Sequence, residues 1–314
     1  MGDEVELLYG EEQSGAEFCK KCKSELAASR LSSREEKLAF TAALVLSAGS
    51  LLIHGESVSL TFQTQNSALV KAVNALTYEL VGRECAIEKK GSKAVEIILS
   101  DALPLLTLCG VLSEADGSIR ICERVSRDYF ESRAAAAFVR GAFLGSGSIS
   151  LGKKYHLECA FGRKSIAEDF VEMLANRGIA AKTAERNYSV VAYVKDSDAI
   201  SDVLALMGAT KAVLSFNEII AARQMNEHVN RQKNCDVYNI DKQVEASLRL
   251  CTQLLELDLC ELSKPLSETA RARLEHPDYS YAQLSELLGV SKSGLKNRLK
   301  KLELICMQKT GRTN

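Results

Sequence analysis

Apolar and polar residues alternate in two stretches of the chain, and this spacing predicts half-buried β-strands. In the first stretch, Val58, Leu60 and Phe62 are separated by serine and threonine. Residues 157–161 repeat the alternation, with leucine, cysteine and phenylalanine at the apolar positions. Successive side chains of a strand point to opposite faces, so each stretch can bury one face and leave the other polar.

The two stretches belong to an internal repeat with an offset of 97 or 98 residues. The segment FTAALVLSAGSL (residues 40–51) matches FVRGAFLGSGSI (residues 138–149). Each copy is predicted to run helix, strand, helix, strand, helix, so the two copies should form a pseudo-twofold α+β core. The other elements expected in the copies are helices near residues 67–81 and 164–177, and strands around 94–99 and 189–194.

The opening helix of each copy is expected to end at a glycine, Gly49 or Gly147, because glycine often follows the last turn of a helix. Small residues also recur four positions apart within these helices: Ala43 and Ser47 in the first copy, Gly141 and Gly145 in the second. Two interpretations are open, because residues four apart share one helix face. The two helices pack closely against each other, or each packs tightly within its own copy.

After the repeat, the pattern predicts two helices joined by a structured turn. Ser215 and Glu218 have capping-box spacing at the start of the first helix, and Asp241 is the expected N-cap of the second. The segment NRQKNCDVYNIDK (residues 230–242) lies between them. Its asparagine and aspartate side chains can bond to nearby backbone groups, which favours an interhelical turn.

The C-terminal region predicts three short helices. The first runs from about Glu268 and ends before Pro277, because the residue preceding proline disfavours the helical conformation. The second begins at Ser280 as N-cap, and Gln283 completes a capping box. A turn at residues 289–290 leads to the third helix, which carries a buried stripe at Leu295, Leu299 and Leu302.

Charge separates this region from the rest of the chain. Residues 263–314 contain ten Lys/Arg and five acidic residues, so they carry +5 while the remainder carries −6. A basic helix after a glycine-containing turn is typical of a helix-turn-helix, whose first residues meet base edges while later cations contact phosphates. Asn297 could pair with adenine; the alternative is a solvated basic helix. The predicted DNA-binding residues are Ser280, Ser291, Lys292, Ser293, Lys296, Asn297, Arg298, Lys300 and Lys301.

The repeat resembles the LAGLIDADG motif of homing endonucleases through RGAFLGSGS (residues 140–148). In those enzymes a position near the end of the motif is an acid that binds the divalent metal. Here the two equivalent positions are Ala48 and Ser146. Mg²⁺ prefers carboxylate oxygens, and phosphodiester hydrolysis generally needs the metal, so the core is expected to be catalytically inactive.

Charge counts favour a scaffold or oligomerisation role for the core over DNA binding. Residues 35–112 carry −2 and residues 135–209 carry +1, whereas a DNA-binding saddle usually needs an excess of cations. The core is therefore expected to be a scaffold. Direct DNA binding by the core stays open because of one basic cluster: Lys153, Lys154, Arg163 and Lys164.

Composition excludes several other classes of protein. No apolar run is long enough to span a membrane, and the acidic segment at residues 1–12 has no export signal, so a cytoplasmic, nucleoid-associated location is expected. The four histidines are dispersed, and no phosphate-binding loop occurs. Cys19 and Cys22 have CxxC spacing without a second pair. No enzyme activity, cofactor or metal is therefore expected.

Three segments together resemble the WhiA regulators of Gram-positive bacteria: the acid-less repeat RGAFLGSGSI, the connector NRQKNCDVYNIDK and the terminal stretch HPDYSYAQLSELLGVSKSGLKNRLKKLELI. The resemblance implies a bilobed LAGLIDADG-like core, a helical connector and a helix-turn-helix. It also implies roles in sporulation transcription, or in cell division and chromosome segregation, in which the core contacts other transcription or division proteins. The stretch ICERVSRDYFESRAAAAF (residues 121–138) is less basic than is usual in the family, so contacts made by that stretch are not carried over.

The expected organisation has six parts: an N-terminal extension (1–34), a first LAGLIDADG-like repeat (35–112), a polar linker (113–134), a second repeat (135–210), a helical connector (211–262) and a DNA-binding domain (263–314, motif about 279–303). The function expected first is a site-specific transcription regulator that binds double-stranded DNA. The alternatives are an architectural nucleoid-associated division factor with little sequence preference, and a residual metal-dependent nuclease.

Overall fold

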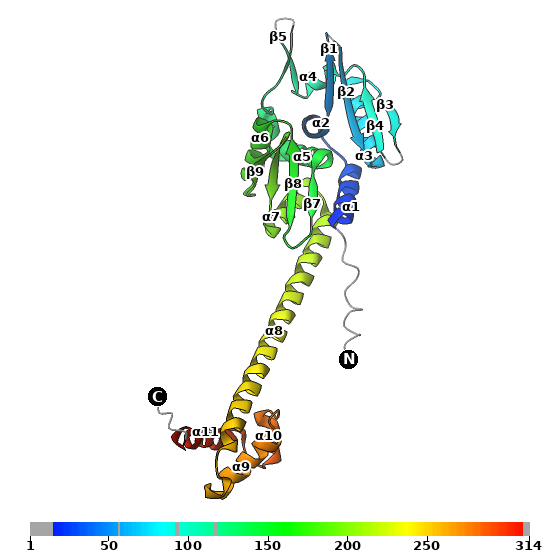
Figure 1. Cartoon of the computed structure of the whole chain (residues 1–314). Helices are drawn as coiled ribbons and strands as arrows, with labels where there is room; N and C mark the ends of the chain where they lie inside the picture. The colour runs from blue at the N-terminus through cyan, green and yellow to red at the C-terminus, as the bar shows by residue number, and fades with distance from the viewer. Residues whose placement is uncertain (1–14, 56, 92–93, 116–117, 310–314) are drawn as a thin grey trace. The chain divides into compact units, whose positions relative to one another are not determined.

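The computed structural model describes residues 15–55, 57–91, 94–115 and 118–309 (Figure 1). The acidic N-terminal segment on which the expected location rests lies outside the described residues. The chain divides into two compact units, Met1–Ala221 and Ala222–Asn314. Among the described helices, none combines the length and the apolar character that a membrane span requires.

The first unit opens with α1 (Gly15–Ala28) and then contains the first copy of the repeat. Its strands form one antiparallel sheet in the order β1-β2-β4-β3, and Leu60 lies opposite Leu99. The helices α3 and α4 pack against this sheet. The elements of the first copy are α2 (Arg34–Ala48), β1 (Ser50–His54), β2 (Ser57–Thr64), α3 (Ser67–Val81), β3 (Ala86–Lys90), β4 (Ala94–Leu99) and α4 (Leu103–Leu108).

The second copy repeats this order of elements. Its sheet has the order β7-β8-β10-β9, and Leu157 lies opposite Val194, the counterpart of the pairing in the first copy. The alternating residues predicted in β2 and β8 are buried, as expected. The elements of the second copy are α5 (Ser132–Ser146), β7 (Ser148–Ser150), β8 (His156–Phe161), α6 (Lys164–Ala175), β9 (Lys182–Arg186), β10 (Ser189–Val194) and α7 (Ser197–Met207).

Each copy has four strands where the sequence pattern predicted two. The additional strands are β1 and β3 in the first copy and β7 and β9 in the second. β3 and β9 are exposed at every residue, so their sequences contain no alternation of apolar and polar positions. The strand β7 has only three residues. These strands are held by backbone hydrogen bonds to a central neighbour, and a hydrophobic pattern does not report such bonds.

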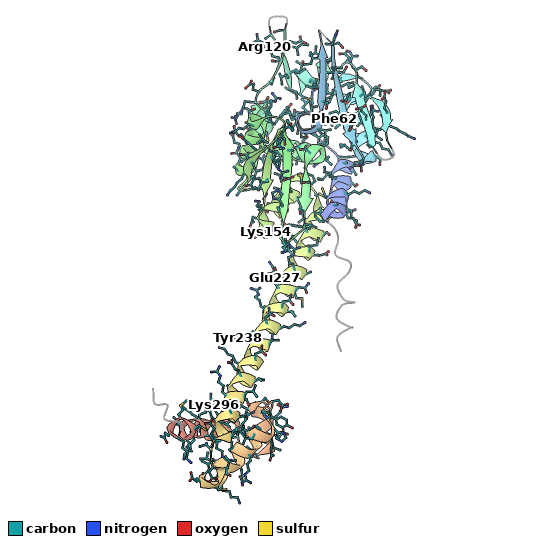
Figure 2. The ribbon with its side chains drawn as sticks, viewed as in Figure 1. Phe62, Arg120, Lys154, Glu227, Tyr238 and Lys296 are labelled. Atoms are coloured by element: carbon teal, nitrogen blue, oxygen red, sulfur yellow. The ribbon has the colours of Figure 1, made fainter. Side chains whose placement is uncertain are left out.

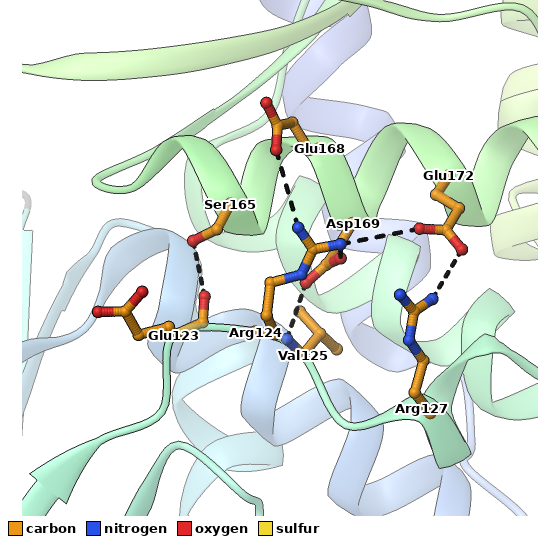
Figure 3. Close-up of polar contacts among 8 residues, drawn as sticks. All are labelled: Glu123, Arg124, Val125, Arg127, Ser165, Glu168, Asp169 and Glu172. Carbon is orange, nitrogen blue, oxygen red and sulfur yellow. Dashed lines mark hydrogen bonds and ion pairs between the residues drawn. The ribbon is translucent and has the colours of Figure 1, made fainter.

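The predicted polar linker also contains regular structure. It forms the hairpin of β5 (Leu112–Ala115) and β6 (Ser118–Ile121), followed by the short 3₁₀ helix η2 (Arg127–Phe130). Polar side chains attach the segment after this hairpin to α6, as Figure 3 shows. The Ser165 hydroxyl donates to the Glu123 carbonyl at 2.6 Å, and Arg124 pairs with a buried carboxylate at Asp169 at 2.6 Å.

The helices α2 and α5 lie side by side at the centre of the first unit (Figure 1). A Cβ added to Gly141 would lie 2.3 Å from the Phe40 carbonyl oxygen, and one added to Gly145 would lie 2.1 Å from the Ser47 hydroxyl. The small residues therefore allow the two copies to pack closely against each other. This supports the first of the two interpretations, in which the opening helices of the copies are in contact. As predicted, Gly49 and Gly147 end the two helices.

The predicted turn between two connector helices is wrong, because α8 (Thr210–Leu255) is one continuous helix. Asp241 lies inside it instead of capping a second helix. The helix contains no glycine or proline, so its polar residues do not interrupt the backbone hydrogen bonds. Phe216, near its start, is buried in the core of the first unit, whereas Leu250 and Leu254 belong to the core of the second.

The second unit ends in a bundle of helices. It contains the 3₁₀ helix η3 (Leu259–Glu261), then α9 (Lys264–Glu275), α10 (Tyr281–Leu287) and α11 (Lys292–Lys309). α9 begins earlier than predicted, at Lys264, because Pro265 lies in its first turn, where proline is favoured. Its end before Pro277 agrees with the prediction.

Candidate nucleic-acid interface

A buried arginine holds the loop that leads into α10. Arg273 is 1% exposed and donates to the carbonyls of His276, Pro277 and Tyr279 at 3.3, 3.5 and 2.7 Å. Burial lowers the pKa of the Arg273 guanidinium from its ordinary value. Three carbonyl acceptors compensate part of the cost of burying this charge, so the loop has a defined shape at the start of α10.

The capping box of α10 is formed as predicted. The Gln283 backbone N–H donates to the Ser280 hydroxyl at 3.3 Å, and the Ser280 N–H donates to the Gln283 side-chain oxygen at 2.9 Å. The Ser280 hydroxyl also donates to that oxygen at 2.8 Å. Ser280 therefore fixes the first turn of α10, and its hydroxyl is occupied within the protein.

Replacing Ser280 with alanine is expected to destabilise α10 by about 1 kcal/mol, the usual cost of removing an N-cap. Hydrogen exchange of the amides in residues 281–288 should become about fivefold faster. Ser267→Ala is the matched control, because Ser267 lies inside α9 and caps no helix. Equal exchange in the two variants would show that the box does not stabilise α10.

The turn and the third helix also agree with the sequence prediction. Gly289 has φ +60°, a conformation that glycine adopts without steric cost. The Gly294 N–H donates to the Ser291 hydroxyl at 3.1 Å, so Ser291 caps α11. The stripe predicted to be buried is buried in the second core: Leu295, Leu299 and Leu302. This packing fixes which face of α11 is left to solvent.

The solvent face of α11 contains most of the predicted DNA-binding side chains. Lys292, Ser293, Lys296, Asn297, Lys300 and Lys301 are exposed, and Arg298 is half-buried. Figure 2 labels Lys296 on this helix. Within the part of the chain that the structure describes, no carboxylate lies within ion-pair distance of these five cations. Their positive charge is therefore not neutralised by neighbouring side chains.

Arg273 is the residue that sequence reasoning did not identify. It follows Leu266 by seven positions and lies on the buried face of α9. The signal that could have identified it is a charged residue among the apolar positions of a buried helical stripe. Arginine in such a position is expected to satisfy backbone carbonyls. It shapes the interface without lying on it.

The former metal positions of the core hold no acid and are partly used for other bonds. The Ser146 hydroxyl donates to the Ala160 carbonyl at 2.7 Å and accepts from the Ala160 N–H at 2.9 Å. Ala48 is half-buried and offers only a methyl group. Among the described residues, no three His, Cys, Asp or Glu side chains form a group that could hold a metal ion. Both cysteines of the CxxC pair lie on α1, and burial raises the pKa of Cys22 to about 12.

Acidic side chains accompany the cations on the sheets of the core. Glu158 on β8 pairs with Arg186 at 2.6 Å and with His156 at 2.9 Å. Burial opposes ionisation of Glu158, but these hydrogen bonds outweigh it and lower its pKa below the ordinary value. Lys90 pairs with Glu96 at 2.9 Å on the first sheet. Such pairs reduce the charge available to DNA phosphates.

The basic cluster predicted in the core has two members engaged with protein groups. Arg163 donates to the Cys122 carbonyl at 2.6 Å, and Lys164 pairs with Glu185 at 3.2 Å. Lys153 and Lys154 are exposed in the turn between β7 and β8, where Figure 2 labels Lys154. The cluster thus presents fewer unpaired cations than α11.

Two family models match the chain. The model for the WhiA LAGLIDADG-like domain matches residues 135–226, and the model for the WhiA C-terminal HTH domain matches residues 229–306. The first match includes β7–β10 and the second includes α9 to α10 and most of α11.

Relatives and a solved structure are similar over nearly the whole chain. The probable cell division protein WhiA of Clostridium perfringens is 30% identical over 305 residues, covering 92% of this chain and 96% of the relative. The protein of the same description from Thermoanaerobacter pseudethanolicus is 32% identical over 306 residues, covering 92% and 96%. The crystal structure of full-length DUF199/WhiA from Thermatoga maritima covers 92% of this chain and 97% of that one, with 20% identity and a TM-score of 0.54, which shows a shared fold.

Proposed function

Because the chain belongs to the WhiA family, we propose that it is a double-stranded-DNA-binding regulator that acts on the nucleoid. Its relatives are named probable cell division proteins, and we assign this chain to cell division and chromosome segregation, or to sporulation transcription. The helix-turn-helix binds the DNA. The LAGLIDADG-like core cuts nothing and provides a surface for other transcription or division proteins.

The observation that carries this proposal is the unneutralised charge of α11. Its exposed face presents Lys292, Lys296, Lys300 and Lys301 on a helix whose opposite face is fully packed. A helix oriented in this way after a tight turn fits the major groove. Binding of cations to phosphates releases condensed counterions, which supplies affinity without sequence preference.

The roles of the interface residues follow from their chemistry. Ser293 and Asn297 carry hydrogen-bonding groups on the first two turns of α11, and we assign them to base edges. The four lysines and Arg298 contact phosphates, which position the helix. Ser280 and Ser291 act as caps: Ser280 fixes the first turn of α10, and Ser291 caps α11, whose first backbone amides lie at a helix N-terminus, where phosphate binding is favoured.

The test replaces Lys296 with alanine in the full chain and measures DNA binding across a salt series. We expect affinity to fall about fivefold to tenfold at low salt, with the slope of log K against log salt reduced by about one unit. Lys154→Ala is the matched control, because Lys154 is an exposed lysine of the core. If Lys154→Ala weakens binding and Lys296→Ala does not, the core is the DNA surface.

Competition with random DNA separates a site-specific regulator from an architectural factor. A regulator keeps a preferred site when random DNA is in excess, whereas an architectural factor loses binding in proportion to the competitor. The residual-nuclease alternative fails if supercoiled plasmid stays intact in the presence of Mg²⁺ or Mn²⁺. We expect that outcome, because the Ser146 hydroxyl at a former metal position is already bonded to the Ala160 backbone.

A further inference from the structure

A large pocket lies in the first unit, beside the ends of α2 and α5. It has a volume of about 940 Å³, within the range of small-molecule sites. Residues of α1, β2, β4 and α3 line it, together with the segment from Ser148 to Gly152. Ala48 and Gly145, at the ends of the two central helices, also line it. The pocket therefore includes the former metal position Ala48, whereas Ser146 does not line it.

The inner wall of the pocket is apolar. Leu44, Phe62, Leu69 and Ile97 line it, and each of these side chains is at most 7% exposed. Figure 2 labels Phe62 on β2, within the first unit. An apolar wall of this kind favours a ligand with a hydrophobic body, because such a ligand loses water-exposed surface when it binds.

All the charged residues that line the pocket are positive. Its lining includes Lys20 and Lys23 of α1 and no aspartate or glutamate. The Lys23 ammonium makes one long hydrogen bond, 3.5 Å to the Leu144 carbonyl, and lies 5.6 Å from the centre of the Phe143 ring. Among the described residues, no carboxylate lies within ion-pair distance of either ammonium. An ammonium has three donors, so both lysines can bind a further acceptor.

We propose that this pocket binds a small anionic amphiphile, a molecule with an apolar body and one carboxylate, sulfonate or phosphate head. The body lies against Phe62 and Ile97, and the head lies between Lys20 and Lys23. A divalent metal is disfavoured, because the lining contains two lysines and no carboxylate that could hold the metal. This binding activity goes beyond the proposed DNA interface and does not depend on it.

The test uses two dyes that share one apolar body and differ in charge. Anilinonaphthalene sulfonate carries the anionic head, and N-phenyl-1-naphthylamine lacks it. Fluorescence titration of the full chain should show saturable binding of both. The combined change Lys20→Gln with Lys23→Gln should weaken sulfonate binding about tenfold and leave the neutral dye unchanged, because only the charge-assisted contacts are lost.

Lys21→Gln is the matched control, because Lys21 lies on the same helix, pairs with Glu17 at 2.9 Å and does not line the pocket. It should leave both affinities unchanged. Equal losses from Lys21→Gln and from the double variant would overturn the proposal, and so would the absence of saturable binding. If a short DNA duplex displaces the sulfonate dye competitively, the pocket is part of a DNA surface and the proposal fails.

A second measurement needs no lysine variant. Cys19 lines the pocket, whereas Cys260 is exposed and lies outside it. Saturating sulfonate dye should slow alkylation of Cys19 by iodoacetamide at least fivefold, read by peptide mass spectrometry, and leave Cys260 unaffected. Unchanged alkylation of Cys19 with the dye bound would place the dye elsewhere and overturn the proposal.

Discussion

Replacing Gly141 with alanine is expected to lower the free energy of unfolding of the core by about 3 kcal/mol, the upper part of the usual range for overpacking. The added Cβ would lie 2.3 Å from the Phe40 carbonyl oxygen and 3.0 Å from the Ala43 Cβ. The nearest obstacle is backbone, so no side-chain rotation can relieve the contact. The helices α2 and α5 must separate, and both helices contribute to the core throughout their length.

Urea unfolding followed by circular dichroism measures this effect, and the midpoint of the core transition should fall by about 1 M. Gly162→Ala is the matched control, because a Cβ added to Gly162 meets nothing within 4 Å and the residue does not have a positive φ. It should be neutral or stabilise slightly, since alanine restricts the unfolded chain. A Gly141→Ala variant as stable as the Gly162→Ala variant would disprove close packing of the two copies.

Replacing Asp169 with alanine is expected to cost the core about 3 kcal/mol, because it leaves a buried donor without its acceptor. Asp169 is 0% exposed, and its carboxylate accepts from the Val125 N–H at 2.8 Å and pairs with Arg124 at 2.6 Å (Figure 3). Without the carboxylate, the segment after β6 loses its attachment to α6. Hydrogen exchange in residues 122–130 should rise together with the loss of stability.

Glu168→Ala provides the matched control, because the two acids are adjacent and share one arginine. Glu168 lies 3.8 Å from Arg124, and its side chain is about half exposed to solvent. Exposed ion pairs contribute about 0–1 kcal/mol, so this variant should unfold nearly as the unmodified chain does. Equal destabilisation by both variants would mean that the network acts as a surface cluster, and that burial of Asp169 contributes nothing specific.

The prediction of the repeat succeeded where local patterns reflect burial. The alternation at Val58, Leu60 and Phe62 located β2, and the capping residues Ser280 and Ser291 located the starts of α10 and α11. In each case the signal lies within a few residues of the element it defines, since strand alternation and helix capping are local.

The prediction failed where the structure depends on partners distant in sequence. β3 is exposed at every residue, so only its pairing with β4 identifies it as a strand. The segment at residues 230–242 has the composition of a turn, yet it forms part of α8. Hydrogen bonds from side chains to the nearby backbone compete with the helical hydrogen bonds in this segment. Because the segment contains no glycine or proline, the backbone can still remain helical.

By itself, the sequence determined the duplicated α+β core, the three C-terminal helices and the absence of acids at Ala48 and Ser146. These features follow from the identity and spacing of neighbouring residues. Only the tertiary structure decided that Gly141 and Gly145 join the two copies, that Asp169 holds the segment after β6, and that Lys20 and Lys23 share a pocket with Phe62. Each of these depends on which segments meet in space, and the packing of the whole core selects those contacts.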